Sequence, residues 1–404
     1  MNPFYIAYAR TFQFLLARMG RLLKYKEPKR LSSALEIASF LKENGKTHPF
    51  LVSGRSTFAS PASQDIILVL NKEGIKVTPY LMQGKEPSIK ECEVMGESYI
   101  KECCDCIISI GGGSRMDAAK SLAVHLAYID KPILNFKGVL KVHRDLPLHI
   151  AIPTTAGSAS EDSISMVLTD ESHGDKFAIT SPRLLPKAYY FDARYLMEIP
   201  RLQGAESGMD AIAHNLESYL GSALPKKDRE ITVSAIASLY KNLETFYCSK
   251  RTKEVALELF ECSRIGGYSF SRGYVGYVHA LGHALGGKTH LSHGKLIAIL
   301  LPHVLLAYKN KAHKKLAYLC DRLNLTPDKS KSNAEKATLF IGYLTALGQK
   351  MGISASLGLD LSEKELNDIV DHAYKEANPF YPVPRILSKK ELRDIVLEAN
   401  TTWK

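Results

Sequence analysis

Cys106-Ile107-Ile108-Ser109-Ile110-Gly111-Gly112-Gly113-Ser114 is the segment that most clearly indicates the fold of the first half of this chain of 404 residues. Its first five residues form a short apolar run, which predicts a buried β-strand. The segment 117–128 that follows has the pattern of a helix. Glycines at such a junction let the backbone approach a phosphate closely, and the helix N-terminus offers free N–H groups to the anion. The loop therefore predicts either a phosphate site or only a tight turn, since its spacing is not Gly-x-Gly-x-x-Gly.

Strands and helices alternate on both sides of this loop, from about residue 50 to about residue 200. Besides 106–110, we expect strands at 50–52, 75–77 and 148–152, and helices at 66–73 and 117–128. Such alternation indicates a parallel sheet with helices on both faces. We therefore predict an α/β N-terminal domain over residues 1–200, with a Rossmann-like parallel sheet that binds a nucleotide.

The second half of the chain has a different pattern, with long helical periodicity and few β-branched runs. We expect helices at 208–221, 229–246, 253–269, 295–306, 334–351 and 362–376. The sequence therefore predicts an all-α C-terminal domain over residues 201–404.

A second polar loop, Pro153-Thr154-Thr155-Ala156-Gly157-Ser158, follows the strand expected at 148–152. The hydroxyls of Thr154, Thr155 and Ser158 are suited to phosphate or ribose oxygens. Taken alone, the loop is equally typical of a polar turn.

Two pairs of residues in the helical half have the spacing of metal ligands. Asp210 and His214 are four residues apart, as are His279 and His283, so each pair lies on one helix face. A further histidine, His293, follows ten residues after His283, beyond Gly286 and Gly287. One carboxylate and three of these four imidazoles suit Fe²⁺ or Zn²⁺, so we predict a metal site in this domain, although either pair alone is more typical of surface or core histidines.

Four segments of the chain resemble the iron-containing (group III) alcohol dehydrogenases, whose relatives include glycerol dehydrogenase and dehydroquinate synthase. They occur in the family's order and span most of the chain from about residue 30. The segments are Gly111-Gly112-Gly113-Ser114-Arg115-Met116-Asp117-Ala118-Ala119-Lys120, Pro153 to Glu161, Gly208-Met209-Asp210-Ala211-Ile212-Ala213-His214, and His279 to Gly287 continuing through Ser292-His293-Gly294 to His303.

The resemblance implies specific roles for residues of this sequence. It implies metal ligation by Asp210, His214, His279 and His293, and it leaves His283 beside the metal rather than on it. It implies contact with the nicotinamide-side ribose for Lys176. The cofactor phosphates are expected on two loops, at Gly112, Gly113, Ser114, Asp117, Thr154, Thr155 and Ser158.

Two positions depart from the family's pattern. Members that prefer NAD carry an Asp after the first strand, where it binds the ribose 2′-hydroxyl. Here that turn contains Gly54, Arg55 and Ser56, which suit a 2′-phosphate, so we predict that NADP(H) is preferred over NAD(H). Glu86 replaces the usual Asn of a Pro-Asn-Pro turn, which puts the cofactor contact there in doubt.

The reaction implied is hydride transfer between a small primary or secondary alcohol and the nicotinamide, with Fe²⁺ or alternatively Zn²⁺ as Lewis acid. His283 is expected either to relay the proton or to have only a hydrogen-bonding role near the metal. Alternatives within the superfamily are a dehydroquinate synthase-like lyase and a glycerol dehydrogenase-like enzyme. A non-catalytic binding protein is a more distant alternative.

The composition limits the remaining classes of function. The net charge of +11 is spread in short clusters without interleaved aromatic residues, which argues against nucleic-acid binding. No apolar run approaches the length of about 20 residues that a membrane span needs. Seven cysteines in so long a chain favour reduced thiols and a cytoplasmic enzyme, and family members are often homodimers or larger homo-oligomers.

The N-terminal segment 1–25 contains no acidic residue and predicts a basic amphipathic helix. Such a segment is typical either of a transit peptide or of a helix that packs on its own domain.

Overall fold

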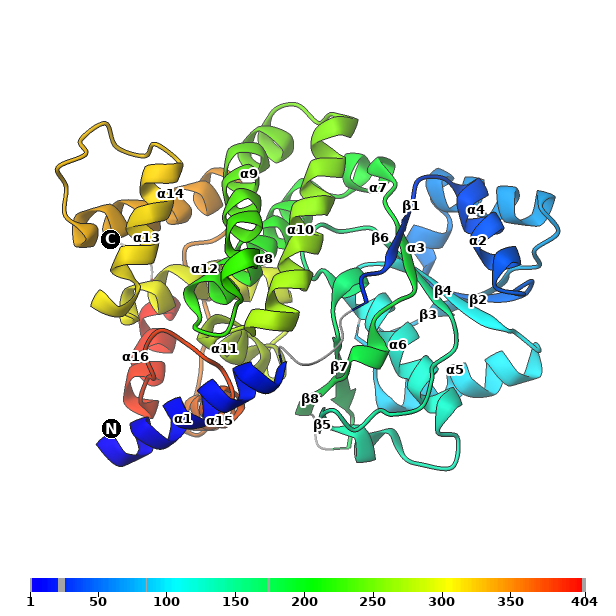
Figure 1. The fold of residues 1–404 in the computed structure, drawn as a ribbon, viewed down its shortest axis with the longest axis horizontal. Helices are drawn as coiled ribbons and strands as arrows, with labels where there is room; N and C mark the ends of the chain where they lie inside the picture. The colour runs from blue at the N-terminus through cyan, green and yellow to red at the C-terminus, as the bar shows by residue number, and fades with distance from the viewer. Residues whose placement is uncertain (1, 21–25, 85, 173–174, 402–404) are drawn as a thin grey trace. The chain divides into compact units, whose positions relative to one another are not determined.

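The computed structural model describes residues 2–20, 26–84, 86–172 and 175–401. The chain divides into two compact units (Figure 1). One unit is Lys24–Ile199, and the other combines Met1–Leu23 with Pro200–Lys404. The described part of the N-terminal segment groups with the helical unit and not with residues 26–199, and the domain bounds 1–200 and 201–404 stay a prediction.

The unit Lys24–Ile199 is built on a six-stranded sheet whose order is β1-β9-β6-β4-β2-β3. All its strand pairs are parallel, as the alternation of strands and helices predicts. The strands are β1 (Lys29–Leu31), β2 (Pro49–Gly54), β3 (Thr78–Met82), β4 (Cys106–Gly111), β6 (His149–Pro153) and β9 (Ala188–Tyr190).

Helices cover both faces of this sheet. Figure 1 shows α2 (Ala34–Glu43) and α4 (Pro61–Lys72) on one face, and α5 (Ile89–Lys101) and α6 (Gly113–Ala127) on the other. Alternate residues of β2 and β4, such as Phe50, Val52 and Ile107, pack against Met95 of α5 and Leu122 of α6 in a buried core. The short helices α3 (Arg55–Phe58) and α7 (Ala193–Glu198) complete this unit. The α/β fold class is therefore confirmed.

Two features of this unit differ from the sequence expectation. The strand expected at 75–77 begins three residues later, because the N–H of Ile75 donates to the carbonyl oxygen of Leu70 and closes the end of α4. A second sheet, ordered β5-β8-β7, was not anticipated. Its strands are β5 (Gly138–Val139), β7 (Ser165–Asp170) and β8 (Asp175–Thr180), and each is too short or too polar to stand out from a loop.

The unit containing Pro200–Lys404 is helical, as expected. Three of its helices begin with a capping box, in which a serine and a glutamate three residues later exchange hydrogen bonds: Ser332 with Glu335, Ser362 with Glu365, and Ser388 with Glu391. The helices are α8 (Arg201–Leu220), α9 (Arg229–Cys248), α10 (Lys253–Gly273), α11 (Tyr277–Gly286), α12 (His293–Ala307), α13 (Asn310–Arg322), α14 (Asn333–Lys350), α15 (Glu363–Ala377) and α16 (Lys389–Asn400).

The N-terminal segment forms helix α1 (Pro3–Gly20), and the rest of the helix expected over 1–25 lies outside the described residues. Arg10 donates to the carbonyl oxygens of Val383 and Pro384, and Gln13 donates to that of Tyr381. These bonds attach α1 to the helical unit. None of the described helices has the length and apolarity needed to cross a bilayer.

Candidate functional site

The two polar loops predicted from the sequence meet at the carboxyl ends of β4 and β6. A Cβ atom at Gly113 would lie 2.7 Å from Cβ of Ser158, and one at Gly112 would lie 3.3 Å from Oγ1 of Thr155. The N–H of Thr154 donates to the carbonyl oxygen of Gly111. The loops therefore pack so closely that only glycine fits at 113, and the N-terminus of the 15-residue helix α6 opens beside them. This is the arrangement that binds phosphate in open α/β sheets.

The chain changes direction in the sheet between β2 and β4. From β2 it continues outward to β3, and from β4 it continues to β6 on the opposite side. Nucleotides bind at such a switch point, outside the carboxyl ends of the strands. Gly54 and Gly111 form these two ends, and the side chain of Arg115 lies against both, with Nη2 3.4 Å from a Cβ built on Gly54. Arg115 is thus a cationic residue at the switch point that the sequence prediction did not single out.

The other predicted cofactor residues differ in their surroundings. Arg55 and Ser56 are exposed at the start of α3. The carboxylate of Asp117 accepts hydrogen bonds from the hydroxyl of Ser160 at 2.7 Å and from the N–H of Val167 at 2.9 Å, so it ties α6 to the 153–161 loop and to β7. Contact of these residues with a cofactor stays a prediction.

Lys176 on β8 forms an ion pair with Glu86, with Nζ 2.5 Å from Oε2. Glu86 is the residue that departs from the family's usual Asn. The ion pair therefore joins Lys176, which is expected to contact the nicotinamide-side ribose, to Glu86, which stands where the family usually has an Asn.

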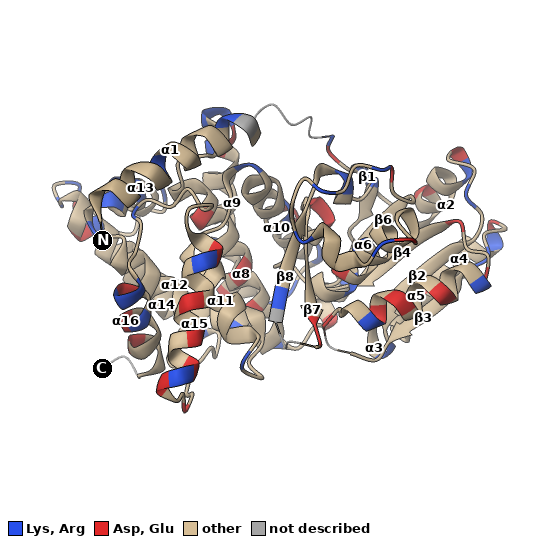
Figure 2. Cartoon of the chain, turned by 90° about the horizontal axis from the view of Figure 1, so that it is seen from below, with Lys and Arg blue, Asp and Glu red and all other residues tan. Residues whose placement is uncertain are grey.

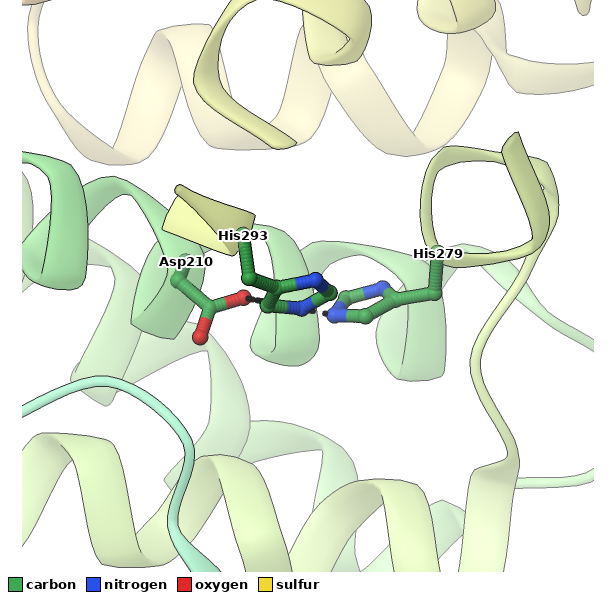
Figure 3. Close-up of side chains that lie close together, drawn as sticks. All are labelled: Asp210, His279 and His293. Carbon is green, nitrogen blue, oxygen red and sulfur yellow. Dashed lines mark ion pairs between the residues drawn. The ribbon is translucent and has the colours of Figure 1, made fainter. Parts of the chain in front are cut away.

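The predicted metal ligands come from three helices of the helical unit. Asp210 lies on α8, His279 on α11 and His293 at the first residue of α12, and their ligand atoms all lie within 4.8 Å of one another (Figure 3). Oδ1 of Asp210 is 3.4 Å from Nε2 of His279 and 3.6 Å from Nε2 of His293. Ligand atoms about 2.1 Å from one ion in a tetrahedral site are about 3.4 Å apart, so these separations fit a divalent metal.

The hydrogen bonding of this cluster is incomplete without a cation. Oδ1 of Asp210 and Nε2 of His279 are buried, and neither has a hydrogen-bond partner among the described residues. A buried polar atom left unpaired costs about 1–3 kcal/mol, and a buried unpaired charge costs more. The two atoms face each other from different helices, 3.4 Å apart, and a metal ion bound between them would be a partner for both.

The protonation states of the cluster also suit a cation. Burial opposes the charge on Asp210, but His214, His293 and His279 together hold the pKa of this carboxyl well below its usual range. Desolvation and the neighbouring histidines lower the pKa of His293, although 36% of its side chain is exposed. Asp210 and Glu217 outweigh burial at His279 and raise its pKa to about 9. An ionised carboxylate and a neutral imidazole are the forms that bind a metal, and a metal ion held here would replace the proton on His279.

His214, the fourth predicted ligand, lies beside the compact group rather than within it. Its Nδ1 is 3.7 Å from Oδ1 of Asp210, and its ring stacks on that of His279 with centroids 4.2 Å apart. Phe270 packs against the ring of His214, with a centroid separation of 4.7 Å. His214 is therefore adjacent to the cluster, and its ligation stays a prediction.

Two glutamates that the sequence analysis missed hold the histidines in place. Nδ1 of His279 is 2.6 Å from Oε2 of the buried Glu217, and Nδ1 of His283 is 2.8 Å from Oε1 of Glu376. The ring of His283 stacks on that of His293, with centroids 5.5 Å apart. The spacing of Glu217, seven residues after Asp210 on the same helix face, could have revealed it. Glu376 lies 93 residues from His283, and no local pattern joins them.

Comparisons with known proteins agree with both halves of this description. Residues 31–193 match the family model "Iron-containing alcohol dehydrogenase", and residues 204–400 match "Fe-containing alcohol dehydrogenase family, C-terminal". A 1,3-propanediol dehydrogenase of Citrobacter freundii is 30% identical over 333 residues, which cover 82% of this chain and 85% of that protein. An NAD-dependent methanol dehydrogenase of Bacillus methanolicus is 22% identical over 367 residues, covering 90% and 95%. The solved structure of an alcohol dehydrogenase from Oenococcus oeni superimposes with a TM-score of 0.87 at 25% identity, covering 93% of this chain and 99% of that one.

The nucleotide-type sheet and the buried carboxylate–histidine cluster define a class of metal-dependent, nicotinamide-linked dehydrogenases. The chain belongs to the iron-containing alcohol dehydrogenase family. It is therefore an oxidoreductase of a family that uses a metal ion and a nicotinamide cofactor, and the resemblance stated from four sequence segments is confirmed.

Proposed function

We propose that this chain interconverts small primary or secondary alcohols and their carbonyl compounds, with a divalent metal bound by Asp210, His214, His279 and His293. The observation that carries the proposal is the group formed by Asp210, His279 and His293. Among the described residues, its buried atoms Oδ1 of Asp210 and Nε2 of His279 have no hydrogen-bond partner outside this group. Fe²⁺ is the ion proposed, with Zn²⁺ as the alternative, because both accept this ligand set.

A divalent ion held by these residues would supply a Lewis acid that stabilises negative charge on the oxygen of the substrate. The nicotinamide supplies or takes up the hydride. The protein residues have two tasks. Glu217 keeps Nδ1 of His279 occupied, so that Nε2 is directed toward Asp210. His283, whose Nδ1 is bound to Glu376, has Nε2 as the atom that exchanges a proton with the substrate hydroxyl.

We further propose that the enzyme prefers NADP(H) to NAD(H). Gly54 stands where members that prefer NAD have an Asp, so no carboxylate is present there to repel a 2′-phosphate. Nη2 of Arg115 lies 3.4 Å from the position that a Cβ atom of residue 54 would take. A guanidinium binds phosphate through charge-assisted hydrogen bonds, which are about twice as strong as neutral ones. Gly54, Arg55 and Ser56 were the residues predicted for this role, and Arg115 is added to them.

The remaining proposals concern the setting of the enzyme. All seven cysteines are free, which supports a cytoplasmic location. A homodimer or a larger homo-oligomer is proposed from the family resemblance alone. Light scattering of the purified protein tests that statement directly.

The decisive experiment is a panel of short alcohols and aldehydes assayed with both cofactors, after reconstitution with Fe²⁺ and, separately, with Zn²⁺. We expect multiple turnovers with net oxidation or reduction of the cofactor, and loss of turnover on chelation. A lyase would give product without net change of the cofactor, and such a result would refute the proposal.

The cofactor preference has its own test. We expect kcat/KM with NADPH to exceed that with NADH by roughly tenfold or more, and Arg115→Met to lower the NADPH value alone. Gly54→Asp should favour NADH. Comparable efficiencies with the two cofactors would contradict the preference and would leave the dehydrogenase activity standing.

A further inference from the structure

Helix α1 has one face that is fully accounted for by its contacts with the helical unit. Ala9 and Gln13 are buried, and Arg10 and Gln13 donate to three backbone carbonyl oxygens of residues 381–384. The ring of Phe12 packs edge-on against that of Phe380, with centroids 5.5 Å apart. This inner face fixes which face of α1 is turned away from the protein.

The outer face of α1 is also apolar. Phe4 is 85% exposed, Phe14 57%, Tyr8 56% and Leu15 55%. Phe4, Tyr8 and Leu15 are separated by four and seven residues and so follow one side of the helix, with Phe14 next to Leu15. A helix that is apolar on both faces is normally covered on both. The outer face of α1 is therefore a surface that requires a covering partner.

The charged residues of α1 itself all have the same sign. Figure 2 shows basic residues and no acidic residue on α1, and the sequence contains no acidic residue before Glu27. Arg18 is exposed, and its guanidinium lies 4.9 Å from the ring centroid of Phe14. Two more basic residues, Arg21 and Lys24, follow Gly20 in the sequence. Aromatic and aliphatic side chains with adjacent cations are the combination that binds the interface of an anionic bilayer.

We propose that the outer face of α1 lies on an anionic lipid surface and attaches the enzyme peripherally to a membrane. The helix has 18 residues and is about 27 Å long, so it lies along the interface rather than crossing it. The four exposed side chains insert among the headgroups, and Arg18 meets their phosphates. This site lies outside the proposed catalytic residues and does not depend on the proposed reaction.

The size of the face favours lipid over a second copy of the chain. A standard protein–protein interface uses about 20–30 residues from each side, whereas this face offers four large apolar side chains and one arginine. A bilayer needs no complementary shape, so a narrow row of side chains is enough. An acidic peptide would match the charge but would leave the aromatic row without a role.

The test is co-sedimentation of the full-length protein with vesicles of phosphatidylcholine alone or of phosphatidylcholine mixed with phosphatidylserine. We expect binding to the anionic vesicles only, and loss of binding at about 1 M salt, where the Debye length falls to about 3 Å. Phe14→Ser combined with Leu15→Ser should lower the apparent affinity roughly tenfold or more, because two apolar insertions are lost. Arg18→Gln should lower it roughly fivefold.

The matched control is Leu68→Ser combined with Leu397→Ser, on α4 and α16. These leucines are 52% and 44% exposed, so the control removes similar exposed apolar area elsewhere and should bind as the wild type does. Binding equal for both vesicle types, or unchanged in the α1 variants, would overturn the proposal. So would light scattering that shows the wild type as an oligomer and the α1 double variant as a monomer, because the face would then join two copies. If the double variant unfolds, Arg18→Gln takes its place: weaker binding to anionic vesicles supports the proposal, and unchanged binding overturns it.

Discussion

Glu217 on α8 binds Nδ1 of His279 on α11 at a distance of 2.6 Å, and the two side chains are among the most buried polar groups of the helical unit. The same carboxylate accepts the N–H groups of Gly276 and Val278, each at 2.8 Å. Glu217 thereby orients the first turn of α11 and the ring of His279 together. A carboxylate on one ring nitrogen fixes the histidine tautomer, so that the other nitrogen is free to act as a metal ligand.

Substitution of Glu217 should weaken metal binding. In Glu217→Gln, one acceptor oxygen is replaced by an NH₂ group, which faces hydrogen-bond donors and cannot accept from them. The tautomer of His279 is then no longer fixed. We expect the metal affinity, measured by competition with a chromophoric chelator, to fall roughly 10- to 100-fold. Glu230→Gln, at an exposed position of α9, is the control and should bind metal as the wild type does. Equal affinities in the two variants would show that Glu217 only stabilises the fold.

Substitution of His283 should separate turnover from metal binding. His283 is held by Glu376 and stacks on His293, but its Nδ1 is already occupied. We expect His283→Ala to retain its metal and to lower kcat roughly 100-fold or more, which is the usual contribution of general acid–base catalysis. Glu376→Gln should give a smaller loss, because the ring stays but its tautomer is no longer fixed. His313→Ala serves as the control, and unaltered turnover in His283→Ala would rule out the proton role.

The contact between the two glycine-containing loops predicts a rescue experiment. In Gly113→Ala the new Cβ would be 2.7 Å from Cβ of Ser158, so we expect a loss of about 1–3 kcal/mol in the free energy of unfolding. Ser158→Gly removes the opposing atom and should restore most of this stability in the double variant. The control is Gly342→Ala on α14, where no atom lies within 4 Å and where alanine should stabilise the helix by about 0.5–1 kcal/mol. Additive losses in the double variant would argue against the contact.

The parts of the fold that could be read from the sequence are those set by local pattern. Strands β2, β4 and β6 are buried on both faces, so their apolar runs are unbroken and the sequence identifies them. β7 alternates between buried and half-buried residues, and β1 and β9 have three residues each, so they gave no comparable signal. The assignment of α1 to the helical unit depends on bonds to residues 381–384, which no local pattern contains.

The candidate site shows the same limit. The spacing within each helix identified Asp210, His214, His279 and His283 as candidates. That they lie close together in the fold was expected from the family resemblance and not from the spacing. Arg115 was part of a recognised motif, but its contact with Gly54 follows from the pairing of β2 with β4, which joins residues far apart in the chain. Pairings of this kind follow from the whole fold, because each strand's neighbour is set by packing and not by its own residues.

The buried histidine of the sheet predicts how stability depends on pH. His149 on β6 is bonded to Oγ of Ser109 on β4 at 2.8 Å, and burial lowers its pKa to about 3. The unfolded chain binds a proton at this ring below about pH 6.5, whereas the folded protein does not, so stability falls as the pH falls from about 6.5 toward 3. Each pH unit in this range costs about 1.4 kcal/mol, which makes about 2 kcal/mol at about pH 5.

We expect His149→Gln to remove this part of the pH dependence. The measurement is urea unfolding of the wild type and the variant at about pH 8 and about pH 5, with a chelator present because metal ligation also changes with pH. We expect the variant to be less stable at about pH 8, because its amide has more polar groups that need hydrogen bonds. The comparison therefore uses the change in the free energy of unfolding with pH and not its absolute value. We predict a change smaller by about 2 kcal/mol than in the wild type. His143→Gln, at an exposed position of the same unit, should keep the wild-type change, and an equal change in all three proteins would show that His149 is not the titrating group.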